Sequence, residues 1–462
     1  GPIESLTYPL ILESHKTYYN CIMSHTEFKI IDPYTQRTLS TYPISTYTNL
    51  VDQAQNLSTV FNTWSKQPIN QRVSILSQLR AHMLKHETKI ATYISTDMGK
   101  PITEAMGEVK KSMEAIEYYE TQADTIAAAM QLPYGHREPL GVILGIMPWN
   151  FPLWQQIRFM IPTLLAGNVC LIKPAYNTYR TAEWLQTCIN SVTDTPPIAT
   201  CMASNADTQR CIASDYIAGV SLTGSVRAGK QVGATAGTHI KPCVLELGGS
   251  DPYIICDDAD IDTATSEAIK ARFLNAGQTC ISAKRFLIQD TCYEAVLEQL
   301  VTKASDFLHC GDPLDPKTTI GPLARPDIKT TLDDQLARAN VPENAILYKG
   351  PENADVKNYM RPLIIDGQGL PKDSPLLTEE VFGPIAICMP FSTISDAITM
   401  ANATPFGLGA SIWSTSTDTL NKFKETIMCG TLAMNNMVRS QVNIPFGGRK
   451  QSGLGIELGI RD

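Results

Sequence analysis

The sequence contains no paired-cysteine motif and no long apolar run. Its twelve cysteines are scattered, without a C-x-x-C pair or the spacing of a zinc site, and the N-terminus has no basic region followed by an apolar one. We therefore expect reduced thiols in a cytoplasmic protein, with no signal peptide and no bound metal. The most apolar stretch, residues 159–172, is interrupted by Pro162, Gly167 and Asn168, so it is too short to span a membrane.

Positive charge is also scarce. The chain has 38 lysines and arginines against 46 aspartates and glutamates, which gives a net charge of -8. This balance argues against nucleic acid or an anionic membrane surface as a partner. Hydrophobic residues make up 43% and charged residues 18% of the 462 residues, which predicts a globular protein of two or more domains.

Two motifs of well-known enzyme classes are missing. No G-x-G-x-x-G sequence follows a predicted strand, and there is no Walker loop. The last of the seven histidines is His309, whereas a papain-like enzyme has its histidine roughly 130 residues or more after the cysteine. A nucleophilic cysteine late in this chain would therefore need a different base.

Hydrophobic spacing predicts an α/β fold. Apolar residues recur at helical spacing over residues 51–64, 73–83 and 101–116, after a short strand-like stretch at 31–48. Beyond Pro133, strands are expected at 141–146, 169–172, 216–222, 243–247, 284–288, 385–390, 409–413 and 431–435, with helices near 181, at 262–274 and at 292–307. This alternation predicts parallel sheets with helices on both faces. We expect two such lobes, which meet near residue 246 around a ligand-binding cleft.

Cys280 has the sequence surroundings of a reactive thiol. It follows a short polar turn, residues 275–279, which is not a typical core sequence. Free cysteine is nevertheless among the most buried residue types, so one cysteine out of twelve is by itself a weak candidate for catalysis. The assignment therefore depends on a base, an oxyanion donor and a cofactor site elsewhere in the chain.

Glu246 and Asn150 are the candidates for the base and the oxyanion donor. Glu246 ends an apolar strand, where burial should raise its pKa and suit it to act as a general base near neutrality. The alternative is a buried glutamate paired with a lysine or arginine. Asn150 offers a side-chain N–H group between Trp149 and Phe151, as an oxyanion hole requires. The alternative is an Asx-turn before Pro152.

A nucleotide site is indicated by one turn and one lysine. Gly224 and Ser225 follow a predicted strand and open a helix that contains Gly229, so backbone N–H groups at the helix start could bind a pyrophosphate. An ordinary serine N-cap explains the same pattern. Lys173 closes another strand, where it would lie near ribose hydroxyls or, alternatively, in solvent.

Six segments occur in the order of one enzyme superfamily. They are Pro148-Trp149-Asn150-Phe151-Pro152, Leu222-Thr223-Gly224-Ser225, Leu245-Glu246-Leu247-Gly248-Gly249, Asn275-Ala276-Gly277-Gln278-Thr279-Cys280, Glu379-Glu380-Val381-Phe382-Gly383-Pro384 and Pro445-Phe446-Gly447-Gly448. From about residue 30 to its end, the chain resembles the aldehyde dehydrogenase superfamily. Residues 152–155, 224–229 and 247–252 most resemble the short bacterial succinate-semialdehyde dehydrogenases.

The resemblance implies a domain organisation. A Rossmann-like dinucleotide-binding domain would comprise residues 1–122 and 141–246, and an α/β catalytic domain residues 247–435. A small β extension for oligomerisation would comprise residues 123–140 and 436–462. The protein would then form a homodimer or homotetramer.

The resemblance also implies a role for each site residue. Cys280 would attack the aldehyde, Asn150 and the Cys280 N–H would hold the oxyanion, and Glu246 would activate the hydrolytic water. Lys173 would bind the adenosine ribose and Glu380 the nicotinamide ribose. The remaining implied cofactor contacts are Trp149, Tyr176, Gly224, Ser225, Gly229 and Phe382. Because Tyr176 stands where NAD-preferring relatives carry a glutamate, the cofactor is expected to be NAD or NADP.

The implied substrate is a small carboxylated aldehyde, succinate semialdehyde. Arg158 matches one of the arginines that bind the carboxylate in such enzymes, as bidentate geometry favours. The second arginine position holds Leu274 here, so Arg439 or Ser440 is expected to compensate. The alternatives are another aliphatic aldehyde as substrate or, in a different class, a cysteine hydrolase without a cofactor.

Overall fold

The computed structural model describes residues 23–24 and 26–460. The expected absence of a signal peptide concerns residues that lie outside this range. Among the described residues, none of the helices is both long and apolar enough to cross a membrane.

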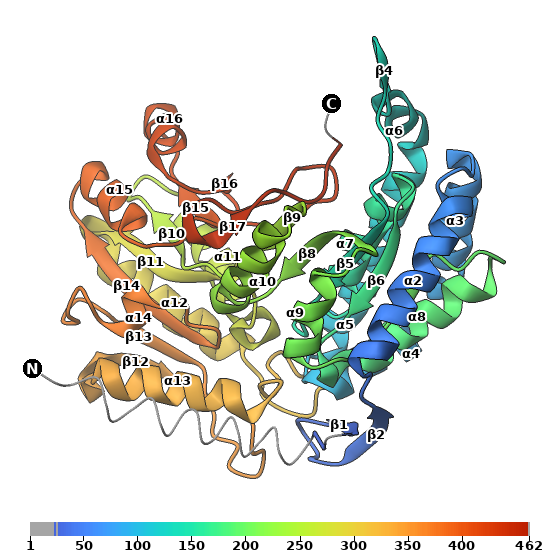
Figure 1. Ribbon diagram of the computed structural model, residues 1–462. Coiled ribbons are helices and arrows are strands. Elements are labelled where there is room, and N and C mark those ends of the chain that lie inside the picture. Colours follow the sequence, from blue (N-terminus) through green and yellow to red (C-terminus); the bar gives the residue numbers. More distant parts are fainter. Residues whose placement is uncertain (1–22, 25, 461–462) are drawn as a thin grey trace, which may run out of the picture.

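The described chain opens with a hairpin and a group of helices. The antiparallel hairpin consists of β1 (Glu27–Ile31) and β2 (Thr38–Pro43). The helices are α2 (Tyr47–Trp64), α3 (Ile69–Lys85), α4 (Glu87–Met98), α5 (Ile102–Thr121) and α6 (Ala123–Ala129). A two-stranded hairpin, β3 (Gln131–Leu132) and β4 (Gly135–His136), then projects away from the rest of the protein (Figure 1).

The first large sheet has the strand order β17-β9-β8-β5-β6-β7 and is parallel except for β17. Its strands are β5 (Val142–Ile146), β6 (Val169–Lys173), β7 (Ile198–Thr200), β8 (Ile217–Thr223), β9 (Cys243–Glu246) and β17 (Gly453–Leu454). Its helices are α7 (Trp154–Leu165), α8 (Tyr179–Ser191), α9 (Asn205–Ile212) and α10 (Val226–Thr238). Helices α2 and α7 both pack on β5 and β6, while α10 packs on β8 and β9.

The second large sheet has the order β12-β13-β14-β11-β10-β15-β16 and is parallel except for β12. Its strands are β10 (Asp251–Ile255), β11 (Ala283–Gln289), β12 (Ile346–Lys349), β13 (Leu363–Asp366), β14 (Ile385–Phe391), β15 (Gly409–Trp413) and β16 (Thr431–Met434). Its helices are α11 (Ile261–Phe273), α12 (Tyr293–Phe307), α13 (Pro326–Ala339), α14 (Pro375–Thr378), α15 (Ile394–Asn402) and α16 (Thr417–Thr426).

The chain passes from one sheet to the other directly after Glu246. Strand β9 ends at this residue and β10 begins at Asp251 in the second sheet. The chain end returns, because β17 pairs with β9 next to Glu246 (Figure 1). The two expected α/β lobes are therefore present and meet where the sequence predicts, whereas the assignment of a separate role to each domain stays a prediction.

The predicted strands and helices are confirmed, but several short elements are absent from the sequence prediction. Strand β10 was not predicted from the sequence because Pro252 is its second residue, and proline is rare in central strands. The register between β10 and β11 shifts between Asp251 and Pro252, which accommodates the missing N–H group. Strand β7 has only three residues, and α4 follows α3 without an intervening glycine or proline.

A buried ion pair joins the helical group to the first sheet. Lys100 and Glu108 pair with almost no exposure of either side chain, and the Lys100 ammonium lies 3.7 Å from the centre of the Phe151 ring. One Glu108 oxygen also accepts the backbone N–H groups of Leu153 and Trp154, at 2.9 and 3.0 Å. Glu108 therefore caps the start of α7 and fixes the segment that carries Asn150.

We predict that Lys100→Met lowers the free energy of unfolding by about 3–5 kcal/mol, because it leaves the Glu108 carboxylate buried without its counter-charge. Lys110→Met is the matched control, since Lys110 is exposed and pairs only loosely with Glu114, at 3.9 Å. It should cost less than about 1 kcal/mol. Urea unfolding followed by tryptophan fluorescence measures both, and equal losses for the two variants would contradict the prediction.

Candidate active site

A cavity of about 300 Å³ lies between the two sheets, around Cys280. Its lining residues are Pro148, Trp149, Asn150, Gln155, Thr223, Gly224, Ser225, Glu246, Leu247, Gly248, Cys280, Thr331, Glu380 and Phe382. The cavity thus brings together the three predicted catalytic residues and most of the predicted cofactor contacts, although they come from segments far apart in the sequence.

The turn before Cys280 has an unusual backbone. Asn275, Ala276 and Gly277 have φ angles of 55°, 53° and 73°, all in the left-handed region. Such a run is costly for residues that carry a side chain. At Gly277 an added Cβ would also lie only 2.3 Å from the carbonyl oxygen of Gly383. The turn therefore ends α11 sharply and needs glycine at its last left-handed position.

Hydrogen bonds from other segments hold this turn. A Glu104 oxygen of α5 accepts the Asn275 N–H at 2.8 Å. The Asn275 side chain donates to the carbonyl oxygens of Asn150 and Gln278, at 3.0 and 3.2 Å. Asn150 Nδ2 donates to the same Gln278 carbonyl at 3.1 Å. Asn150 is buried and is thereby positioned by the turn that carries Cys280.

Cys280 is half-buried, and its charge surroundings are mixed. Burial raises the pKa of its thiol to about 11, while Arg158 and Lys284 act in the opposite direction and Glu380 and Asp251 add to the rise. Lys284 approaches from β11 and donates to the Cys280 carbonyl oxygen at 2.8 Å. A thiolate, rather than a thiol, is the nucleophile, so these two cations favour the reactive form.

Glu246 is buried at the end of β9 and lines the same cavity. Burial raises its pKa well above the usual range of a glutamate, with Arg158 opposing and Glu457 adding to the rise. The predicted elevation of its pKa is therefore confirmed. Neither of its carboxylate oxygens has a hydrogen-bond partner among the described residues. This argues against a glutamate that is simply neutralised by a bonded lysine or arginine, and leaves the carboxyl able to bind a water.

Glu380 and Phe382 line the cavity from the loop before β14. Glu380 Oε1 accepts the Gly249 N–H at 3.1 Å and pairs with Lys284 at 3.5 Å. An added Cβ at Gly248 would lie 2.1 Å from the other Glu380 oxygen, so glycine permits this close approach. The Phe382 ring meets Trp149 edge to face, with 5.7 Å between ring centres.

The N-terminus of α10 is capped by Ser225 and also forms part of the cavity wall. Ser225 Oγ accepts the Ala228 N–H at 3.2 Å, which is the ordinary N-cap arrangement. Gly224 and Ser225 also line the cavity, so the exposed end of the helix faces it. Gly229 lies elsewhere: an added Cβ there would be 2.5 Å from Leu247. Its position allows α10 to pack closely on Leu247, and its role as a cofactor contact stays a prediction.

A second hollow of about 580 Å³ adjoins this cavity at the segment that follows β5. Met147 lines the second hollow, and the next two residues, Pro148 and Trp149, line the cavity around Cys280. Lys173 and Tyr176 are in the wall of the second hollow. Lys173 is buried, and burial lowers the pKa of its ammonium. The alternative of a solvated lysine is therefore wrong.

A third cavity of about 520 Å³ adjoins Cys280 through its two neighbours, Thr279 and Ile281. The predicted substrate residues Arg439 and Ser440 line it, as does Leu274. Arg439 is exposed at the rim and pairs with Glu267 at 3.1 Å. Ser440 is buried, and its hydroxyl has no hydrogen-bond partner among the described residues.

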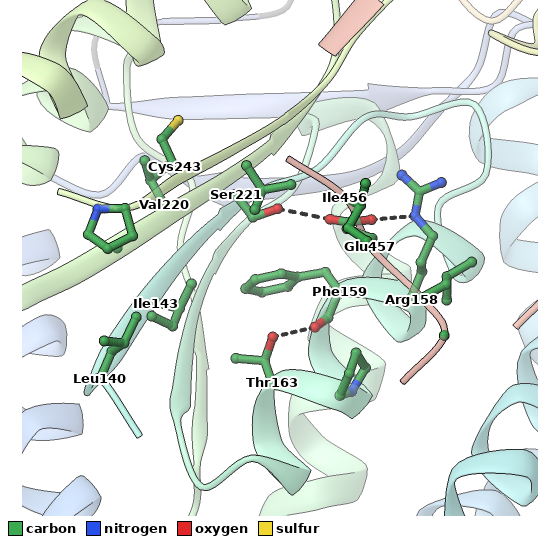
Figure 2. A pocket seen from close by; sticks show the side chains of 16 residues that line it. Leu140, Ile143, Arg158, Phe159, Thr163, Val220, Ser221, Cys243, Ile456 and Glu457 are labelled. Carbon is green, nitrogen blue, oxygen red and sulfur yellow. Dashed lines mark hydrogen bonds and ion pairs between the residues drawn. The ribbon is translucent and has the colours of Figure 1, made fainter. Parts of the chain in front are cut away.

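Arg158 is separated from the other predicted substrate residues. It lines a hollow of about 390 Å³ next to β8, together with Glu457 of the C-terminal segment. Figure 2 shows Glu457 between Ser221 and Arg158. The Arg158–Glu457 ion pair measures 2.6 Å, and Ser221 donates to Glu457 at 2.9 Å. Arg158 also donates to Thr223 Oγ1 at 3.1 Å, so a substrate role for Arg158 stays a prediction.

Comparison with known proteins indicates the same family as the sequence motifs. The family model described as "Aldehyde dehydrogenase family" matches residues 22–462. The chain belongs to the aldehyde dehydrogenase family. It is 36% identical over 448 residues to an NADP(+) succinate-semialdehyde dehydrogenase of Mycobacterium leprae, covering 94% of this chain and 97% of the relative. A second such enzyme, of Deinococcus radiodurans, is 33% identical, with 93% and 91% covered.

Solved structures share the fold of this aldehyde dehydrogenase. One is the succinic semialdehyde dehydrogenase from Streptococcus pyogenes in complex with NADP+, with a TM-score of 0.87 and 32% identity. The match covers 93% of this chain and 96% of that chain. The predicted fold class is therefore confirmed.

Sequence reasoning missed two lysines of this aldehyde dehydrogenase, Lys284 and Lys111. Lys284 and Arg285 are adjacent cations at the start of an otherwise apolar strand, and this pattern signals a cation held inside the protein. Lys111 lies on α5 and lines the third cavity. Its spacing from Glu108 places both on one side of the helix, but no sequence pattern points from α5 to Cys280.

We predict that alkylation of Cys280 by iodoacetamide, without cofactor, becomes about tenfold faster with each pH unit between about pH 7 and about pH 9, because the thiolate fraction rises below the pKa. The measurement is the rate of modification at Cys280 by peptide mass spectrometry. Lys284→Met should slow the reaction at each pH, since it removes a cation that lowers the pKa of Cys280.

The matched control for this measurement is Lys329→Met, a surface change at a lysine that pairs with Asp333. It should leave the rate unchanged. A rate that levels off below about pH 8 would show that the thiol ionises far more readily than its burial indicates.

Proposed function

We propose that this enzyme oxidises a small carboxylated aldehyde, succinate semialdehyde, to the acid with NAD+ or NADP+. The observation that carries the proposal is the cavity in which Cys280, Glu246 and Asn150 meet Glu380 and Phe382. The two relatives named above, which are named as NADP(+) succinate-semialdehyde dehydrogenases at 36% and 33% identity, support the substrate and the cofactor.

The residues that line the cavity around Cys280 and the adjoining second hollow fit a nicotinamide dinucleotide. The hollow lined by Lys173 and Tyr176 offers a buried ammonium and an aromatic ring for an adenosine ribose. Ser225 at the start of α10 offers backbone N–H groups for a pyrophosphate. Glu380, fixed by Gly249 and Lys284, would bind the nicotinamide ribose. When bound, the nicotinamide supplies the acceptor for a hydride.

The protein's own residues would carry out the other steps, which are the attack on the aldehyde, the stabilisation of the oxyanion and the hydrolysis of the thioester. The Cys280 thiolate attacks the carbonyl carbon, so a C–S bond forms and the carbonyl oxygen gains negative charge. The Cys280 backbone N–H and Asn150 Nδ2 would stabilise this oxyanion. After oxidation the acyl group is held on Cys280 as a thioester. Glu246 takes a proton from water, the resulting hydroxide attacks the thioester, and the acid leaves as the Cys280 thiolate is released.

The third cavity supports a carboxylated aldehyde because it combines an apolar wall with polar groups. Leu274 and Phe151 contribute apolar surface, and Ser440 a buried hydroxyl. Arg439 lies at the rim. Arg158 stays a predicted substrate contact, although Glu457 and Thr223 already bind its guanidinium. We also propose that the enzyme acts in the cytoplasm as a homodimer or homotetramer, without nucleic acid or membrane partners.

The decisive experiment compares succinate semialdehyde with butanal, each with NAD+ and NADP+, by the absorbance of the reduced cofactor. We predict that kcat/KM is highest for succinate semialdehyde and that Cys280→Ala abolishes all four activities. A preference for butanal would favour the alternative of an uncharged aliphatic aldehyde. Activity that survives Cys280→Ala would exclude the thioester route, and turnover of an ester without any cofactor dependence would favour a cysteine hydrolase.

We further predict that Glu246→Gln lowers steady-state turnover by about 10²–10⁴-fold, the usual contribution of a general base. The amide cannot take a proton from water, but the attack by Cys280 does not need this base. The variant should therefore still produce a burst of one reduced cofactor per Cys280, seen by stopped-flow absorbance. Loss of the burst together with turnover would assign Glu246 to the first half of the reaction instead.

A further inference from the structure

The third cavity contains three cations, of which two are already engaged by the protein. Lys270 and Arg439 both pair with Glu267, at 3.0 and 3.1 Å. Lys111, on α5, is half-buried in the same lining. Its ammonium lies 4.2 Å from the centre of the Trp154 ring. Within the described part of the chain, no carboxylate forms an ion pair with it.

The carboxylate that most affects Lys111 is committed elsewhere. Glu108 acts on the Lys111 charge, but it pairs with Lys100 and accepts the N–H groups of Leu153 and Trp154. Glu114, which also lines the cavity, lies beside Lys110, at 3.9 Å. Lys111 is therefore a cation that faces a cavity and forms no ion pair with any of the described carboxylates.

The electrostatic environment of Lys111 is that of a half-buried cation close to other cations. Burial lowers the pKa of Lys111 to about 8, and the positive charges of Arg158, Lys100 and Arg439 add to this effect, while Glu108 opposes it. An anion beside the ammonium would relieve the cost of the charge.

A second polar group in the cavity also lacks a partner. Ser440 Oγ is buried and makes no hydrogen bond to any described residue. Buried hydroxyl groups in proteins are nearly always satisfied, by protein, by water or by a ligand. An ammonium and a hydroxyl thus line one cavity, next to the residues that flank Cys280, and both groups can donate hydrogen bonds to a carboxylate.

We propose that Lys111, together with Ser440, binds the carboxylate of the aldehyde substrate and so determines its specificity. This inference rests on the proposed function. It accounts for Leu274, which occupies the position where related enzymes would carry an arginine: here the positive charge comes from α5 instead, and Leu274 contributes apolar wall for the short carbon chain between the two ends of the substrate.

The first test is the kinetics of Lys111→Met with succinate semialdehyde and butanal. Loss of one charge-assisted contact should raise KM for succinate semialdehyde about 10- to 100-fold. The kcat/KM for butanal should change less than about threefold, since butanal has no carboxylate. Lys111→Arg, which keeps the charge, should retain the preference for succinate semialdehyde.

The matched control is Lys270→Met, which removes a cation from the same cavity that Glu267 already engages. It should change KM for succinate semialdehyde by less than about threefold. If Lys111→Met affected both aldehydes equally, or if Lys270→Met had the same effect as Lys111→Met, the inference would be overturned.

The second test does not depend on turnover. Succinate should protect Cys280 against iodoacetamide in the absence of cofactor, and the succinate concentration for half-protection should rise at least about tenfold in Lys111→Met. Equal protection of both proteins would overturn the inference. Protection that depends on Lys111 in an enzyme without succinate semialdehyde activity would leave the carboxylate site standing and refute the proposed function alone.

Discussion

The left-handed turn at residues 275–277 is the constraint on which the site depends. It ends α11 and turns the chain so that Cys280 lies between the cavity with Glu246 and the cavity with Ser440. Because three successive residues have positive φ angles, the turn is costly in isolation and must be stabilised by its surroundings. Its partners come from α5 and from the Asn150 segment, so the position of Cys280 is held by contacts between distant segments and not by its own sequence.

The same bonds connect Asn150, the proposed oxyanion donor, to the helical group. The Gln278 carbonyl receives both the Asn150 and the Asn275 side-chain amides. Glu108 caps the helix that follows Asn150 and is held by Lys100. A change at Lys100 would therefore reach the turn that carries Cys280 through three hydrogen-bonded links. These are Lys100 to Glu108, Glu108 to the backbone of Leu153 and Trp154, and Asn150 to Gln278. The buried carboxylates of Glu104 and Glu108 lie behind the site and accept backbone N–H groups that the sharp turns leave free.

Sequence reasoning identified the residues that meet in the cavity around Cys280 better than the charges around them. Cys280, Glu246 and Asn150 could be found because each stands in a short local segment with a distinctive neighbourhood. The partner of Arg158 could not be found from the sequence. Glu457 comes from the other end of the chain, and it reaches Arg158 only because β17 returns to the first sheet. Strand β10 was missed for a local reason, Pro252, which a register shift accommodates.

The charged residues on the two sides of Cys280 differ in how firmly the protein holds them. On one side, Lys284 is bonded to the Cys280 carbonyl and paired with Glu380, so its charge is fixed and acts on the thiol. On the other side, Lys111 extends from a helix over Trp154, and no carboxylate in the described part of the chain forms an ion pair with it. A lysine is a flexible point charge, whereas an arginine at position 274 would present a rigid fork from the turn itself. In the proposed carboxylate site the cation comes from α5, and the strained turn stays apolar at Leu274. The substrate charge would then be recognised without adding a charged side chain to the segment that positions Cys280.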